Sequence, residues 1–145
     1  MSNDKEILEL LSANRPPCID TLNGKATHFE SDPPFLKMEF KAVPEFCHSP
    51  NHVVQGGFVT GMLDTSMAHL LIALSGGRLK PISLDINVSF LAPAHPGKLI
   101  SEAKVIRLGK SIGYFTSSLY QQEKLVATAT STIKLAPMPK EFFDA

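Results

Sequence analysis

The stretch that decides the fold is residues 46–76, FCHSPNHVVQGGFVTGMLDTSMAHLLIALSG. Its first part is polar and prone to turns, and Gly56-Gly57 then leads into a run, residues 58–74, that is apolar on nearly all sides. A helix that is hydrophobic all round lies either inside a protein or in a membrane. This run is shorter than the roughly 20 apolar residues that span a bilayer, and it contains a carboxylate, Asp64. We therefore expect a long helix buried in its own domain.

Asp64 is the residue of this helix that most needs an explanation. A buried carboxylate is costly unless it is paired, hydrogen-bonded or used in chemistry. One interpretation is a helix-interior carboxylate that is hydrogen-bonded to Thr60 or Thr65, and the other is a catalytic group. His69, little more than one turn later, is interpreted as a histidine with satisfied hydrogen bonds or one at an interface.

The composition indicates one ordinary domain. The chain has 145 residues, of which 43% are hydrophobic and 19% are charged, as is typical of a single globular unit. Lys and Arg together number 14, and so do Asp and Glu, so the formal charge is zero. This balance offers no electrostatic basis for binding nucleic acid or an anionic membrane surface, and we expect neither partner.

The N-terminus and the cysteines favour a cytoplasmic location. The first residues lack the basic region and the apolar run of a signal peptide. Cys18 and Cys47 do not make a disulfide framework in a chain of this size. Cys47, His48 and His52 are close in sequence, but no second Cys/His pair follows to complete a zinc site. We therefore expect no metal.

Hydrophobic alternation predicts strands on both sides of the long helix, over residues 35–43, 82–90, 99–108, 112–120 and 125–135. Since most of the connections are tight turns, neighbouring strands are expected to be antiparallel. The prediction is an α+β fold in which the helix lies across one antiparallel sheet. Within the strand at 82–90, the side chains of Ser83, Asp85 and Asn87 are expected to share one face.

The N-terminal part is predicted to be mostly outside this core. A short amphipathic helix is expected to begin at the capping box of Asn3 and Glu6 and to end at Pro16-Pro17. Residues 18–34 are expected to be a loop with at most a short strand near 26–29. The single domain, residues 1–145, then divides into an N-terminal helix and loop (1–24), a core (25–136) and a tail (137–145).

Three sequence blocks resemble the PaaI-type acyl-CoA thioesterases, which have the hotdog fold. The blocks are Asn51-x-x-x-Gln55-Gly56-Gly57 with Met62-Leu63-Asp64, then SLDINVSFLAPA over residues 83–94, and RLGK over residues 107–110. The resemblance implies a curved antiparallel sheet of five or six strands wrapped round the long helix. It also implies homodimers that pair into tetramers.

The resemblance assigns roles to four residues. Asp64 is the general base or nucleophile, the backbone N–H of Gly56 is the oxyanion donor, and the Ser83 hydroxyl helps to place the water. Gln55 stands where many members have His, and it can position a group but cannot transfer a proton near neutral pH.

The other expected site residues bind the substrate. Ser49 occupies a position where the family often has Asn or Gln, and Asn51 is a nearby alternative. Without a side chain, Gly57 lets an acyl group approach the backbone closely. Met67 belongs to the apolar helix that is expected to line the acyl pocket. Coenzyme A phosphates are expected at the turn of Arg107, Gly109, Lys110 and Ser111, with His95 near the Pro93–Pro96 turn as an alternative.

The spacing of Asp64 and Gly56 predicts a site shared between two subunits. Eight residues separate them, which is about 10–12 Å along a helix. One thioester carbon cannot touch both in one chain, but a two-fold axis would bring Asp64 of one subunit near Gly56 of the other. The expected activity is hydrolysis of an aryl- or medium-chain acyl-CoA, with no cofactor because coenzyme A is part of the substrate. The alternatives are a non-catalytic acyl-CoA-binding dimer and a hydratase, which Gln55 disfavours.

Overall fold

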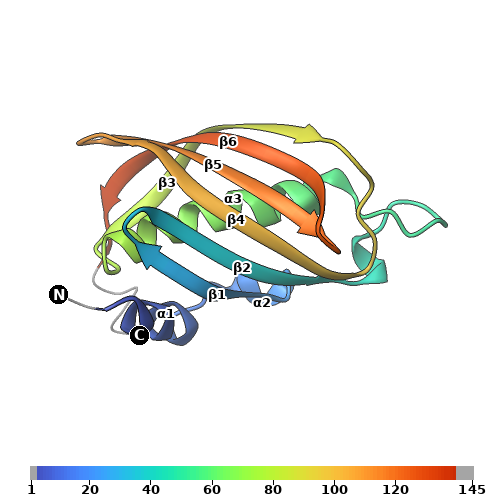
Figure 1. The fold of residues 1–145 in the computed structure, drawn as a ribbon, viewed down its shortest axis with the longest axis horizontal. Helices are drawn as coiled ribbons and strands as arrows, with labels where there is room; N and C mark the ends of the chain where they lie inside the picture. The colour runs from blue at the N-terminus through green and yellow to red at the C-terminus, as the bar shows by residue number, and fades with distance from the viewer. Residues whose placement is uncertain (1–2, 140–145) are drawn as a thin grey trace.

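A computed structural model of the chain describes residues 3–139 and shows one long helix, α3 (Gly56–Leu74), wrapped by a curved sheet (Figure 1). The six strands are antiparallel, in the order β1-β2-β4-β5-β6-β3. They are β1 (Gly24–Ser31), β2 (Pro34–Ala42), β3 (Leu79–Phe90), β4 (Gly97–Leu108), β5 (Ile112–Gln121) and β6 (Lys124–Pro137). The predicted α+β architecture, a helix enclosed by an antiparallel sheet, is confirmed.

Helix α3 is the core of the molecule. Ten of its residues are buried, and the Met62, Leu63 and Leu70 side chains are completely shielded from solvent. By length and composition alone α3 could cross a membrane, but here it is the helix that the sheet covers. Two glycines end the helix: the Gly77 N–H donates to the Ile72 carbonyl and the Gly76 N–H to the Ala73 carbonyl, the hydrogen-bond pattern of a Schellman motif.

The N-terminal region is more regular than the sequence predicts. Helix α1 (Asp4–Ala13) begins at the expected capping box, in which the Glu6 N–H donates to Asn3 Oδ1 at 2.9 Å. The expectation of a loop over residues 18–34 with at most a short strand near 26–29 is right only in part: helix α2 (Pro17–Thr21) precedes the strand, and the strand is the longer β1. In β1 only Gly24 and Phe29 are buried, so the strand lacks the alternation that would reveal it. A 3₁₀ helix, η1 (Pro44–Phe46), follows β2.

A β-bulge at Leu84 interrupts strand β3. Ser83 lies opposite Ile133 of β6, whereas Asp85 lies opposite the next residue, Thr132. An extra residue shifts every later side chain to the other face of the sheet. The expectation that Ser83 shares a face with Asp85 and Asn87 is therefore wrong: Ser83 faces α3, and the Asp85 carboxylate accepts hydrogen bonds from the backbone and hydroxyl of Thr132.

Strand β3 is an edge strand with an exposed apolar character. It pairs with β6 on one side and stands at the end of the strand order. Among residues 3–139, four of the seven exposed large hydrophobic side chains belong to this strand or follow it directly: Ile82, Leu84, Phe90 and Leu91. A long, apolar, unpaired edge is a ready template for pairing with another chain.

Candidate active site

Asp64 and Ser83 meet between α3 and β3. The Ser83 hydroxyl donates a hydrogen bond of 2.8 Å to Asp64 Oδ1. Asp64 is half-buried, and its partner is Ser83 rather than Thr60 or Thr65. The bulge at Leu84 makes this contact possible, since it directs Ser83 toward the helix while the following residues keep their outward alternation. A carboxylate and a hydroxyl held together in this way can orient a water molecule between them.

A pocket of about 330 Å³ opens beside Asp64. Its floor is one face of α3, and its walls come from the start of β3, the segment before and in α2, and the residues after β6. The lining residues are Pro16, Cys18, Asp64, Thr65, Ala68, His69, Ile72, Lys80, Pro81, Met138 and Pro139. We call this the Asp64 pocket. Most of its wall is apolar, which suits an acyl group.

The N-terminus of α3 carries the second half of the expected chemistry. Gln55 is the N-cap, and its Oε1 accepts a hydrogen bond of 2.7 Å from the Gly57 N–H. The Gly56 N–H is the first of the helix and has no partner among the hydrogen bonds of residues 3–139. Free N–H groups at this end of a helix favour a developing negative charge. Gly56 therefore remains available as an oxyanion donor, while Gln55 is engaged in capping.

A second hollow, of about 390 Å³, lies at this helix end, and we call it the Gly56 pocket. Phe90 at the end of β3 forms one wall, and a Cβ added to Gly56 would lie 3.1 Å from the tip of its ring. His48 lies in the same hollow, although the sequence analysis gave it no role in catalysis. The bridge between Cys47 and Val54 closes the base of the 47–54 loop, which projects from the molecule beside the helix start (Figure 1).

The two pockets are separate in a single chain. None of the residues that line the Asp64 pocket also lines the Gly56 pocket. The first adjoins Lys80 and Pro81 at the start of β3, and the second adjoins Phe90 and Leu91 at its end. One chain therefore presents the Asp64 carboxylate and the Ser83 hydroxyl at one place and the Gly56 N–H donor at another.

The structure places the remaining predicted residues in different environments. The Ser49 hydroxyl is buried without a hydrogen-bond partner in the part of the chain that is described, and Asn51 is exposed at the tip of the same loop. The Gly57 N–H is occupied by the Gln55 side chain. Met67 is 0% exposed and packs in the core, so in the single chain it lines neither pocket.

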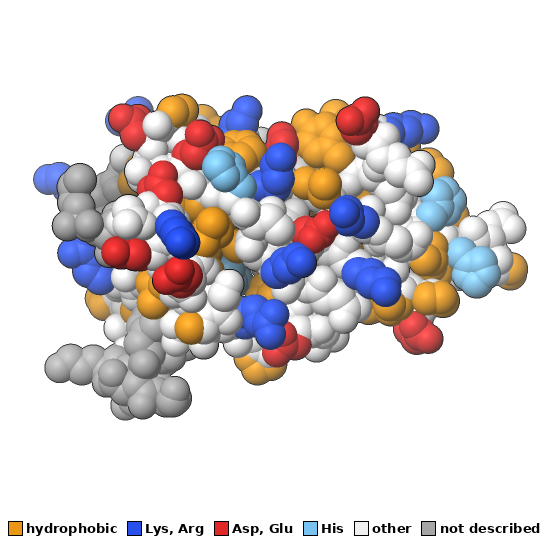
Figure 2. All heavy atoms as spheres, turned by 60° about the horizontal axis from the view of Figure 1, so that its bottom comes forward, with side chains coloured by type: hydrophobic (Ala, Val, Ile, Leu, Met, Phe, Trp, Pro, Cys, Tyr) orange, Lys and Arg blue, Asp and Glu red, His pale blue; other side chains and the backbone are white. Residues whose placement is uncertain are grey.

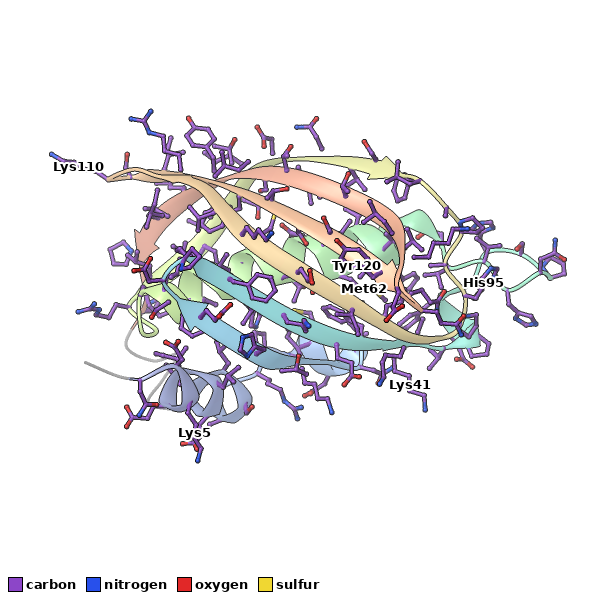
Figure 3. The ribbon with its side chains drawn as sticks, in the orientation of Figure 1. Lys5, Lys41, Met62, His95, Lys110 and Tyr120 are labelled. Atoms are coloured by element: carbon purple, nitrogen blue, oxygen red, sulfur yellow. The ribbon has the colours of Figure 1, made fainter. Side chains whose placement is uncertain are left out.

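The basic turn between β4 and β5 is far from the Gly56 pocket within one chain. Figure 3 places Lys110 at one end of the molecule and His95, beside the 47–54 loop, at the other. Arg107, Lys110 and Ser111 are exposed. Gly109 has a structural role as well, since a Cβ there would lie 2.8 Å from the Ile112 carbonyl oxygen. Within one chain the structure does not bring this turn together with the predicted site residues of the 47–54 loop.

Charged side chains gather elsewhere, over the face formed by the β1–β2 edge (Figure 2). A hollow of about 700 Å³ in this region contains none of the predicted site residues. Its main feature is Glu39, which bridges Lys98 at 3.0 Å and Lys25 at 3.4 Å. The hydrogen bond from Lys98, supported by Lys25, lowers the pKa of Glu39 below its ordinary value. Within residues 3–139, no group of three His, Cys, Asp or Glu side chains is placed to hold a metal ion.

Comparison with known proteins decides the family. The family model of the thioesterase superfamily matches residues 51–128, more than half of the chain. The chain belongs to the thioesterase superfamily. This family is the one that the three sequence blocks resemble, and the match includes both Gly56 and Asp64.

Solved structures agree with this assignment. The chain is 32% identical to a protein of Ralstonia eutropha JMP134 described as a candidate thioesterase and phenylacetic acid degradation-related protein, with a TM-score of 0.81 over 88% of this chain and 98% of that one. The E. coli PaaI protein, from the phenylacetic acid degradation operon, has the same fold, with a TM-score of 0.80 and 18% identity over 95% of this chain and 100% of its own. The predicted resemblance to PaaI-type hotdog thioesterases is confirmed.

A partial match points the same way. A protein of Halobacterium salinarum described as a candidate esterase is 35% identical over 65 residues, which are 41% of this chain. The matched stretch spans 40% of the length of that relative.

Proposed function

We propose that the chain is an acyl-CoA thioesterase in which Asp64 of one subunit and the Gly56 N–H of another act on the same thioester. The observation that carries this proposal is the hydrogen bond between Ser83 and Asp64 beside a largely apolar pocket. A carboxylate that is bonded to a hydroxyl through one oxygen keeps the other oxygen free to accept a proton. This is the arrangement that a general base needs.

The proposed reaction is hydrolysis. Water, held by Ser83 and Asp64, attacks the thioester carbon, and its proton passes to the Asp64 carboxylate. The negative charge that develops on the carbonyl oxygen is stabilised by the Gly56 N–H. The C–S bond then breaks, and coenzyme A leaves as its thiol once the thiolate has taken up the proton. In the nucleophilic variant, an Asp64 oxygen attacks first and water hydrolyses the resulting anhydride.

Pairing of β3 with its own copy would create the shared site. Antiparallel pairing about a two-fold axis would place the start of one β3 beside the end of the other. Lys80 and Pro81 line the Asp64 pocket, and Phe90 and Leu91 line the Gly56 pocket. The same axis would therefore join the Asp64 pocket of one subunit to the Gly56 pocket of its partner. The proposal includes this homodimer, its association into a dimer of dimers, and a cytoplasmic location.

The proposal also includes sites for coenzyme A. Its phosphates would be bound by the exposed turn of Arg107, Gly109, Lys110 and Ser111, with Ser49 and Asn51 contributing from the loop before α3. A single chain separates these two regions (Figure 3), so one of them would come from a partner subunit. The acyl group is expected to be aryl or medium-chain.

One observation favours a second candidate, an acyl-CoA-binding dimer that does not hydrolyse its ligand. Gln55 caps the helix through its carbonyl oxygen, and its amide cannot transfer a proton near neutral pH, so this side chain supplies no acid or base to the reaction. A binding module would need the apolar pocket and the Gly56 N–H but not the Asp64 carboxylate.

The test is thiol release from aryl- and alkyl-CoA thioesters by wild type, Asp64→Asn and Asp85→Asn. Asp85 is the matched control because it follows Ser83 by two residues on β3 but its carboxylate bonds outward to Thr132. We expect Asp64→Asn to lower kcat by about a hundredfold or more, and Asp85→Asn to retain most activity. Tight binding without turnover of any thioester by wild type would instead establish the binding module.

A further inference from the structure

The Asp64 pocket extends along α3 to a buried histidine that thioester hydrolysis, as proposed above, does not use. His69 is 6% exposed and lines this pocket together with Asp64. The two residues are five positions apart, which places them at opposite edges of the helix face that forms the pocket floor. A ligand that begins at Asp64 and fills the pocket would therefore reach His69.

The His69 ring is fixed in one orientation and one tautomer. Its Nδ1 lies 2.9 Å from the Thr65 carbonyl oxygen. Because a carbonyl can only accept, Nδ1 carries the proton, and Nε2 of the neutral ring is left as an acceptor. Burial lowers the pKa of His69 below its ordinary value of 6.5, against the opposing effect of the Thr65 bond, and so favours the neutral ring.

The Nε2 atom has no hydrogen-bond partner in the described part of the chain. None of the hydrogen bonds of residues 3–139 involves it, and it lies on the edge of the ring opposite the atom that is bound to the helix backbone. Apart from Asp64 and Thr65 of the same helix, the polar or titratable side chains of this pocket are Cys18 and Lys80, both exposed. A nearly buried acceptor without a partner favours a ligand that brings a donor.

We propose, on the basis of the thioesterase function above, that His69 determines specificity by accepting a hydrogen bond from a hydroxyl on the acyl group. The substrate class is a short acyl thioester whose hydroxyl lies on the order of 8 Å from the carbonyl carbon, the span from Asp64 to His69 on the helix. The volume of about 330 Å³ has room for one such group.

Two other classes of acyl group fit this end of the pocket less well. An acyl group without a polar end leaves the Nε2 acceptor buried and unpaired, and sites built around a hydrogen bond reject ligands that lack it. An acyl group that ends in a carboxylate could pair with the Lys80 ammonium at the rim of the pocket. At the floor, however, its oxygens would face the Nε2 lone pair, and two acceptors cannot form a hydrogen bond. A hydroxyl donates to Nε2 and remains neutral.

The experiment compares CoA thioesters in matched sets that differ at the far end of the acyl group. One set is 6-hydroxyhexanoyl, heptanoyl and adipoyl, and a second is an aryl acyl group with and without a ring hydroxyl. The enzymes are wild type, His69→Gln, which keeps an acceptor near the position of Nε2, and His69→Leu, which removes it at similar volume. Melting temperatures of all three establish that each is folded.

For wild type we expect kcat/KM to favour the hydroxylated member of at least one set by roughly tenfold or more, mainly through KM. His69→Gln should keep most of this preference. His69→Leu should lose it and should act better than wild type on the unhydroxylated member. Equal preference in wild type and His69→Leu, or no preference for the hydroxyl in wild type, would overturn the role of His69.

A binding measurement separates this inference from the proposed activity. Non-hydrolysable thioether analogues of the same acyl-CoA sets are titrated into Asp64→Asn, with and without His69→Leu. If no thioester is hydrolysed but hydroxylated analogues bind more tightly only when His69 is present, the activity is refuted and the role of His69 stands. Hydrolysis without any His69-dependent preference refutes the role of His69 alone, and failure of every analogue to bind refutes it as well.

Discussion

The Gly56 end and the Asp64 region of α3 have opposite chemical characters. The Gly56 pocket offers a backbone donor and an aromatic wall, with His48 as its one titratable side chain. The Asp64 pocket offers a carboxylate bonded to a hydroxyl and a buried imidazole. One is suited to stabilising negative charge and the other to removing a proton. Neither is complete, and the same edge strand adjoins both.

This difference has a physical basis in the helix itself. Donors are free only in the first turn of a helix, so an oxyanion site built from backbone has to be at its start. A carboxylate that acts as a base is better placed away from this end of the helix. The free N–H groups there would stabilise its ionised form and so make it a weaker base. Separation along the helix keeps each group effective, and in the proposed dimer the second subunit brings them together.

The largest effect is expected from removing the donor at the Gly56 end. Gly56→Pro deletes the N–H, and proline is well tolerated at the first position of a helix. We expect kcat to fall by about 10²–10³. Gly56→Ala is the matched control, since it keeps the N–H and adds only a methyl group against the mobile tip of the exposed Phe90. Equal losses in the two variants would show that crowding, and not the donor, is responsible.

A smaller effect is expected at the Asp64 end from Ser83→Ala, which removes the hydrogen bond to Asp64 Oδ1. Loss of this one bond should lower kcat by about tenfold. Ser83→Thr, which retains a hydroxyl, should recover most of the rate, and Ser89→Ala, an exposed serine of the same strand, should have no effect. Activity of Ser83→Ala equal to that of wild type would remove Ser83 from the site.

Substitutions of Gln55 separate its effect on helix capping from its effect on hydrolysis. Gln55→Ala should lower the free energy of unfolding by about 1 kcal/mol, because the Gly57 N–H loses its acceptor. Gln55→Asp should keep a cap and hence stability, but its negative charge beside the Gly56 N–H should slow hydrolysis. Denaturant unfolding and thiol release measure the two effects. Equal rates for Gln55→Asp and wild type would place the oxyanion away from this helix end.

The smallest expected effect is on the pH dependence of stability. The pKa of His69 is lowered in the folded protein, so the unfolded state takes up the proton more readily. The stability associated with the neutral ring is full above the unfolded pKa of 6.5, and it falls as the pH drops below this value until the folded pKa is reached.

The melting temperature of wild type should therefore decrease more between pH 7.5 and pH 5 than that of His69→Gln. Asp64, Lys80 and Cys18, which face the same pocket, are present in both proteins, so their contributions largely cancel in the comparison. Parallel curves for the two proteins would contradict the lowered pKa.

The sequence was sufficient for most of the architecture because its patterns are local. The all-round apolar helix and the five strands predicted from hydrophobicity lie within a few residues of their predicted bounds. Strand β1 is longer than the short strand expected near 26–29, because its burial depends on α1 packing against it, a contact that no local pattern encodes. Family membership followed from three short blocks with fixed spacing.

The site could be predicted only in part, for a related reason. Asp64 and Gly56 could be singled out because a charge in an apolar helix and a Gly-Gly pair at a helix start can be recognised from the sequence alone. The direction of Ser83 toward α3 depends on the Leu84 bulge, and strict alternation would have left it on the face of Asp85. The placement of His69 in the Asp64 pocket depends on α2 and on the segment after β6, which close over the helix.

The most direct test of the central claim is subunit complementation between Asp64→Asn and Gly56→Pro. Each homodimer lacks one half of both of its sites and should be nearly inactive. Equal mixing, with exchange of subunits verified by native mass spectrometry, makes half of the dimers mixed, and each mixed dimer regains one intact site of two. The account predicts activity of about a quarter of wild type. Mixed dimers that remain as inactive as their parents would show that Asp64 and Gly56 do not act across subunits.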